Sequence, residues 1–298
     1  MKPFQYRAPT LLSEALSLLA SAGQRARALA GGTDLLVQMR RGLISADLIV
    51  DVKKVFELNR LDFDPSDGLT IGAAVPLCRI CESPEVARHY PGLVDALSII
   101  GSVAVRSRAT VGGNLCNAAP SADSIPALIV HGAICTVASR EGTRQVPVAR
   151  FCTGPGQTVL GPGELLVSVR VPPPRPRAGA RYLRFTPRHE MDIAVVGVAA
   201  WLELSEGLTT IANARIALGA VAPTPLLAVE AGASLVGRTP SAAAFAEAAA
   251  LAQRVAAPIS DVRGTAAQRR HLVGILTRRA LEGALQRARG AEPDGRQG

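Results

Sequence analysis

The chain has 298 residues, of which 48% are hydrophobic and only 3% aromatic, and its formal net charge is +9. This length and apolar content suffice for one large core or two modest ones. The basic residues, mostly Arg, are dispersed without helix-turn-helix or zinc-finger spacing, which argues against a nucleic-acid-binding protein. No apolar stretch reaches the ~18–20 residues of a membrane span, and the first ten residues lack the apolar core of a secretory signal. We therefore expect a cytoplasmic protein without a membrane span.

The chain up to about residue 171 alternates helix-like and strand-like segments, which favours an α/β arrangement there. The first two helices are predicted with Thr10 and Thr33 as their N-caps and with Gly23 and Gly42 at their ends. A long loop of small residues is expected from Gly101 to Asp123. The predicted helices cover residues 10–23, 33–42, 76–90, 92–100 and 124–132, and the predicted strands 26–31, 46–52, 69–75, 133–139 and 164–172.

The segment "VPPPRPRAGAR" interrupts any regular element, and it predicts a domain boundary near residue 175. Beyond it, three apolar segments at 182–185, 192–204 and 209–221 are expected to form antiparallel strands. Helices are predicted over 241–256 and 265–289. The second domain is therefore predicted to be α+β, and the closing "GAEPDGRQG" is expected to fray.

Two pairs of adjacent glycines are candidates for a binding site. Gly31 and Gly32 lie between a predicted strand and a predicted helix, where bare backbone and the helix dipole together form an anion cradle. A tight turn without a ligand would use the same residues. Gly112 and Gly113 form a second glycine turn in the long loop, and long ordered loops are often functional. Because neither a Walker A sequence nor G-x-G-x-x-G is present, the two loops suit the pyrophosphate of a dinucleotide held by a non-Rossmann fold.

The cysteines and histidines do not form an evident ligand set. Cys78 and Cys81 are three residues apart in "LCRIC", but no second pair or nearby His completes four ligands, and both suit packing on one helix face. The odd number of five cysteines argues against a disulfide framework. No metal site is predicted, and neither a catalytic acid–base pair nor a nucleophile is identified.

Five segments in order resemble the FAD-binding medium subunit of the molybdenum hydroxylases, a family with carbon monoxide, xanthine and nicotinate dehydrogenase types. They are "AGGTDLLVQM", "ATVGGNLCNAAPSADSIPAL", "FCTGPGQTVLGPGELL", "RHEMDIAVVGVAA" and "DVRGTAAQRRHLVGILTRRAL". The resemblance implies an α+β chain whose two-lobed FAD-binding domain, of the vanillyl-alcohol-oxidase (PCMH) type, covers residues 1–175. A smaller C-terminal α+β domain of the CO dehydrogenase flavoprotein type would cover 176–285, and a frayed tail 286–298.

The resemblance also implies which residues contact FAD. Two glycine loops would hold the pyrophosphate, with Asp34 binding through its backbone N–H because its carboxylate would repel phosphate. Asp123 would bind sugar or ribityl hydroxyls, or else cap the helix that begins at Ser124. Leu166 would supply a backbone contact near the flavin ring, and Arg184 would lie near the cofactor or else be a surface cation. The implied set is Ala30, Gly31, Gly32, Thr33, Asp34, Leu35, Leu36, Gly101, Thr110, Val111, Gly112, Gly113, Asn114, Asp123, Leu166 and Arg184.

The implied function is electron transfer within a larger enzyme. A large molybdopterin subunit would oxidise the substrate, and a small 2Fe–2S subunit would pass the electrons to FAD in this chain and on to an external acceptor. A dimer of heterotrimers is expected, and Arg269, Arg270, Arg278 and Arg279 either face an acidic partner or form a solvated surface. The alternative is a stand-alone FAD-dependent oxidoreductase of the same fold, which would need its own substrate pocket with catalytic acid or base residues. A scaffold that had lost FAD would be expected to have damaged glycine turns, and these are intact.

Overall fold

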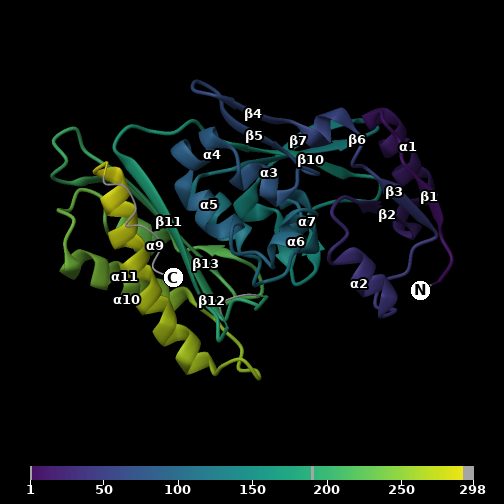
Figure 1. Ribbon diagram of the computed structural model, residues 1–298. Coiled ribbons are helices and arrows are strands. Elements are labelled where there is room, and N and C mark those ends of the chain that lie inside the picture. The colour runs from purple at the N-terminus through teal and green to yellow at the C-terminus, as the bar shows by residue number, and fades with distance from the viewer. Residues whose placement is uncertain (1, 189–190, 291–298) are drawn as a thin grey trace.

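The computed structural model describes residues 2–188 and 191–290, and its elements follow one another as three regions along the chain (Figure 1). Residues 291–298 of the predicted tail, and His189 and Glu190 of the segment "RHEMDIAVVGVAA", lie outside the described residues. No helix within the described ranges is both long and apolar enough to cross a membrane.

The first region is a small parallel sheet with strand order β1-β3-β2, flanked by two helices. Its elements are β1 (Gln5–Arg7), α1 (Leu12–Ala22), β2 (Ala26–Leu29), α2 (Leu35–Arg40) and β3 (Leu48–Asp51). All four residues of β3 are buried, whereas all three of β1 are exposed, so β1 lacks the apolar pattern by which a strand is predicted. The N-cap of α1 is Leu11 rather than the predicted Thr10, and Gly23 ends the helix with φ +53° as expected.

The second region is an antiparallel sheet of five strands with order β4-β5-β10-β6-β7. Its central strand β10 is separated by only six residues from β11 of the next region, across the proline-rich segment. The strands are β4 (Leu61–Asp64), β5 (Gly68–Gly72), β6 (Ile134–Ser139), β7 (Gly142–Pro147) and β10 (Leu165–Val171); a hairpin of β8 (Cys152–Gly154) and β9 (Gln157–Thr158) lies between β7 and β10.

Six short helices lie between β5 and β6, and two of them correct the predicted loop from Gly101 to Asp123. Ser102 and Thr110 accept hydrogen bonds from the N–H groups of Val105 and Gly113 and so cap α6 and α7. The glycine pair therefore lies in a helix rather than in a turn. The six helices are α3 (Leu77–Cys81), α4 (Pro84–His89), α5 (Pro91–Leu97), α6 (Val103–Arg106), α7 (Val111–Asn117) and α8 (Ser124–Val130).

The third region is an antiparallel sheet of order β11-β12-β13-β14 between two layers of helices. Alternate residues of β12 face opposite sides: Ala199 and Trp201 join the core with α5 and α8, whereas Val198 and Ala200 join the core with α10 and α11. The predicted antiparallel strands and both long helices of this region are confirmed. The elements are β11 (Ala178–Phe185), β12 (Val196–Leu204), β13 (Ile211–Gly219), β14 (Leu226–Leu227), α9 (Val229–Ala233), α10 (Ala242–Val255) and α11 (Ala266–Ala288).

A polar cluster around Asp95 of α5 joins this third region to the second. Arg287, near the end of α11, donates two hydrogen bonds of 2.6 and 3.0 Å to the Asp95 carboxylate and a third to the carbonyl of Ala180. Arg181 and the backbone N–H of Tyr182 on β11 also donate to Asp95. Four donors on a single half-buried carboxylate fix the C-terminal helix against the preceding helical layer.

Candidate functional site

A single cavity of about 990 Å³ brings together most of the residues implied by the sequence. Its wall is formed by the β2–α2 loop, the segment from α6 to α8, the stretch from β9 to β10, and the β11–β12 loop. All members of the implied set line it except Leu36 and Val111. Leu36 is 40% exposed on α2, and Val111 is fully buried in the core.

The β2–α2 loop presents unused backbone donors to this cavity. Within the described residues, the N–H groups of Gly31, Gly32, Thr33 and Asp34 donate no hydrogen bond to another protein group. The loop lies directly against the backbone at Arg108, and only glycine at position 31 permits this approach. A Cβ there would lie 2.1 Å from the carbonyl oxygen of Arg108. Gly32 has φ +76°, a conformation that glycine adopts without strain. The N-cap of α2 is Asp34 rather than the predicted Thr33, and its side chain makes no capping hydrogen bond.

The first turn of α7 forms a second part of the wall. The Thr110 side chain accepts a hydrogen bond of 2.9 Å from the N–H of Gly113, while the N–H groups of Val111 and Gly112 donate to no described acceptor. A Cβ on Gly112 would lie 2.4 Å from the carbonyl oxygen of Ala73, so this glycine lets α7 pack against the end of β5. Gly113 is exposed, and a Cβ there would meet only Thr110 Oγ1, at 3.1 Å.

Two amide side chains connect these parts of the wall. Gln38 of α2 donates a hydrogen bond of 3.0 Å from Nε2 to Oδ1 of Asn117 at the end of α7, and both residues line the cavity. Ser124, the first residue of α8, donates to Oδ1 of Asn114. Gln38 and Asn117 lie in the first two segments on which the resemblance rests, but neither belongs to the set it implies, and their meeting across 79 residues gives no local sequence signal.

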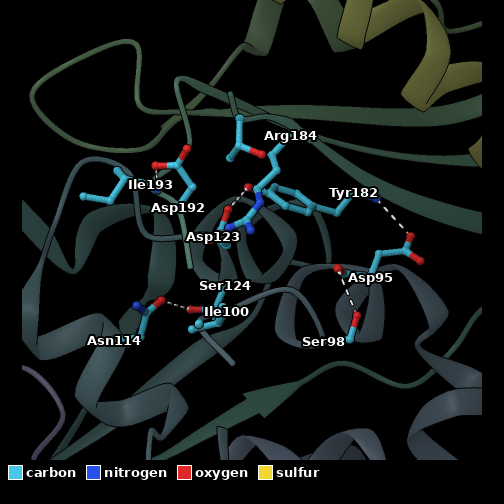
Figure 2. Close-up of polar contacts among 12 residues, drawn as sticks. Asp95, Ser98, Ile100, Asn114, Asp123, Ser124, Tyr182, Arg184, Asp192 and Ile193 are labelled. Atoms are coloured by element: carbon cyan, nitrogen blue, oxygen red, sulfur yellow. Dashed lines mark hydrogen bonds and ion pairs between the residues drawn. The ribbon is translucent and has the colours of Figure 1, made fainter. Parts of the chain in front are cut away.

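Asp123, Tyr182 and Arg184 form a buried cluster at the cavity (Figure 2). Tyr182 Oη and Arg184 Nη1 each donate a hydrogen bond of 2.7 Å to a different oxygen of the Asp123 carboxylate. Arg184 is therefore not a surface cation, because only 6% of its side chain is exposed. Asp123 is the N-cap residue of α8, but its side chain makes no capping bond. Burial raises the pKa of Asp123, and the Arg184 charge and both hydrogen bonds act in the opposite direction.

The remaining carboxylates of the wall are mostly paired with arginines. Glu164 accepts two hydrogen bonds from Arg144, which lower the pKa of its carboxyl group. Asp192 pairs with Arg263 at 2.7 Å, and hydrogen bonding lowers its pKa to about 2. Asp34 is the exception, since desolvation raises the pKa of its carboxyl group. Pairing limits the negative charge that a bound anion would meet.

Sequence reasoning missed the stretch from Gly156 to Leu165 and the residues from Met191 to Ile193, which also line the cavity. Both lie in segments on which the resemblance rests, and the first is dense in glycine. Cys78 and Cys81, in contrast, lie on α3 and do not line the cavity. Within residues 2–188 and 191–290, no group of three His, Cys, Asp or Glu residues could hold a metal ion.

The wall fits an elongated anionic ligand that has polar and apolar parts. Free backbone N–H groups on the β2–α2 loop and α7 can bind phosphate oxygens, and the glycines leave room for close approach. Aliphatic side chains and the Asp123–Arg184 pair offer surfaces for rings and for hydroxyl groups. The volume lies at the upper end of the ~300–1,000 Å³ usual for cofactor and ligand sites. A dinucleotide such as FAD satisfies all these features.

Comparisons with known proteins agree along the whole chain. Residues 2–174 match the family described as "FAD binding domain in molybdopterin dehydrogenase", and residues 181–284 match the "CO dehydrogenase flavoprotein C-terminal domain". The xanthine dehydrogenase FAD-binding subunit of Escherichia coli O157:H7 is 32% identical over 96% of this chain and 97% of its own length. The carbon monoxide dehydrogenase medium chain of Afipia carboxidovorans is 34% identical over 96% and 98%.

Solved structures give the same result for the fold. The reconstituted CO dehydrogenase from Oligotropha carboxidovorans contains a chain that is similar to this one with a TM-score of 0.91 and 33% identity, covering 96% of this chain and 99% of that one. A chain of quinoline 2-oxidoreductase from Pseudomonas putida 86 gives a TM-score of 0.89 and 34% identity, with 97% and 99% covered.

Proposed function

The chain belongs to the FAD-binding medium subunits of the molybdenum hydroxylases, and we propose that it holds one FAD in the cavity of about 990 Å³ and relays electrons there. The observation that carries this assignment is the row of unused N–H groups at Gly31, Gly32, Thr33 and Asp34 on the cavity wall. These donors suit a diphosphate, which FAD has between its two nucleotide halves and FMN lacks.

The residues of the wall would divide the work of holding the cofactor. The β2–α2 loop and the first turn of α7 would bind phosphate oxygens through their backbone N–H groups. Asp123 retains free lone pairs for hydroxyl groups, and Leu166, on the bulged part of β10, would contact the ring through its backbone. FAD, when bound, supplies the redox chemistry, accepting electrons and passing them on, while this chain orients it and sets its electrostatic surroundings.

The relatives are named as subunits or medium chains, which supports a working assembly larger than this chain. We propose a cytoplasmic heterotrimer, paired as a dimer of heterotrimers. In it a large molybdopterin subunit oxidises the substrate, a small 2Fe–2S subunit delivers electrons to this chain, and an external acceptor removes them. Of the arginines considered for an acidic partner, Arg269 is unsuitable: it is 4% exposed and bonded to Asp261 and to two carbonyl groups. Arg270, Arg278 and Arg279 are exposed.

Co-expression with genes for an iron–sulfur subunit and a molybdopterin subunit tests this assembly. We expect the three chains to elute together in size-exclusion chromatography, with equal amounts by subunit mass analysis. The full chain expressed alone should hold FAD but oxidise no organic substrate. A flavoprotein that oxidises an organic substrate without partners would contradict the heterotrimer and support the stand-alone oxidoreductase.

A further inference from the structure

Tyr182 lies outside the cavity wall, yet its hydroxyl is bonded to a residue within that wall. Tyr182 is only 3% exposed, and its Oη donates to Oδ1 of Asp123, whose Oδ2 accepts from Arg184. Asp123 and Arg184 line the cavity and Tyr182 does not, so the hydroxyl can act on a ligand only through Asp123 (Figure 2).

A glycine on the neighbouring strand makes room for this hydroxyl. Gly197 lies inside β12, in register with Arg184 of β11, and a Cβ there would stand 2.4 Å from Tyr182 Oη. Glycine inside a strand weakens the strand, and it often marks a place where another group approaches closely. The hydroxyl makes the closest of these contacts, and two ring carbons of Tyr182 would lie 3.3 and 3.4 Å from the same Cβ. The glycine therefore accommodates the end of the tyrosine ring and, most of all, its hydroxyl.

The charge of the cluster depends on the pKa of Asp123, on which burial and the neighbouring side chains act in opposite directions. Burial is the largest influence and leaves the pKa of Asp123 above its usual value, although the Arg184 charge and the hydrogen bonds from Tyr182 and Arg184 lower it. Burial and the Asp123 charge raise the pKa of Tyr182 well above 10, so the phenol keeps its proton and remains a donor. Removing the hydroxyl would leave the buried carboxylate with one side-chain donor fewer and make it easier to protonate.

We propose that Tyr182 is a positioning residue of the cofactor site, whose hydroxyl favours the ionised Asp123 carboxylate paired with Arg184, so that the charge beside the cofactor persists to a lower pH than it would without the hydroxyl. This inference rests on the proposed binding of FAD in the cavity. Without the hydroxyl, Asp123 takes up its proton at a higher pH than in the wild type, and the Arg184 guanidinium then loses its counter-charge. An unbalanced cation favours the more electron-rich, reduced cofactor.

Other ionisable groups around the cavity remain the same in the comparison that tests this proposal. On the β11–β12 loop, Asp192 is held by Arg188 and Arg263, and on α5 Asp95 is held by Arg181 and Arg287. The remaining ionisable groups of the wall are Arg27, Asp34, Cys116 and Glu164. A difference between two proteins that share all these groups reports on the Asp123 cluster.

The test compares the FAD-loaded full chain with its Tyr182→Phe and Tyr90→Phe variants. Tyr90 is a matched control, because it is 1% exposed and donates its hydroxyl to the carbonyl of Pro172, away from the cavity wall. The flavin midpoint potential is measured from about pH 5.5 to about 8.5, a range in which a carboxyl group with a raised pKa titrates. Urea unfolding of each variant measures the structural effect separately.

We expect the Tyr182→Phe potential to become more positive than that of the wild type toward low pH, with the two curves meeting at high pH. Tyr90→Phe should follow the wild type at every pH while losing similar stability. Adding Gly197→Ala to Tyr182→Phe should leave the potential as it is in Tyr182→Phe. A Tyr182→Phe curve that overlays the wild type, or runs parallel to it, would overturn the inference while leaving FAD binding intact. A wild-type chain that binds no FAD would instead overturn the proposed function, and this inference with it.

Discussion

Gly112 and Gly113 are adjacent in α7, but the space beside each is different. A Cβ on Gly112 would lie 2.4 Å from the Ala73 carbonyl, whereas a Cβ on Gly113 would meet only Thr110 Oγ1, at 3.1 Å. We expect Gly112→Ala to lower the free energy of unfolding by about 1–3 kcal/mol through overpacking. Gly113→Ala should change it by less than about 0.5 kcal/mol.

Binding of FAD should be affected more by Gly113→Ala than by Gly112→Ala, which is the opposite of the order expected for stability. The Gly113→Ala methyl group would enter the part of the cavity where we propose that the backbone binds phosphate, and we expect FAD affinity to fall at least about tenfold, or ~1.4 kcal/mol. Urea unfolding and a fluorescence titration of the apoprotein with FAD measure the two effects. A Gly113→Ala variant that binds FAD like the wild type would show that Gly113 is only a helix residue.

At the scale of elements, α7 illustrates what the Thr110 cap does for the site. The Thr110 hydroxyl accepts from Gly113 N–H, and its loss should cost about 1 kcal/mol of stability, as at other N-caps. We expect Thr110→Val also to weaken FAD binding, because the first turn of α7 would no longer be held against the cavity. Ser83→Ala is the matched control: Ser83 caps α4, accepts from Val86 N–H, and does not line the cavity. Equal FAD affinity in the two variants would contradict a role for the cap.

The same helix shows how far the sequence predicts these elements. Both glycine pairs predicted from the sequence line the cavity, and the apolar segments at 192–204 and 209–221 predicted the C-terminal sheet. The sequence of α7 did not indicate a helix, because two glycines give seven residues a poor helix propensity. The helix instead depends on a cap and on packing against Ala73. Strand β7 was also missed, because only Val146 of its six residues is buried and no apolar pattern indicates a strand there.

At the scale of the whole molecule, the Asp95 cluster joins residues 192 positions apart, which no local pattern predicts. Arg287 is the buried cation of this cluster, and without it only the more exposed Arg181 remains to balance the Asp95 carboxylate. We expect Arg287→Met to lower the free energy of unfolding by about 3 kcal/mol. Arg279→Met, an exposed site on the same helix, should change it by less than about 0.5 kcal/mol. Similar urea midpoints for the two variants would show that the cluster adds no stability.

The central claim is that this chain carries non-covalent FAD in the cavity between its glycine loops. Cys116 is the cysteine in the wall; although the residue is exposed, desolvation of its thiol by the surrounding protein raises the pKa to about 12, which makes it a poor site for covalent attachment. The most direct measurement is acid precipitation of the purified protein, followed by chromatography of the supernatant and quantification against chain concentration. We predict one FAD per chain, fully released. FMN, a flavin retained on the precipitate, or no flavin would contradict this account.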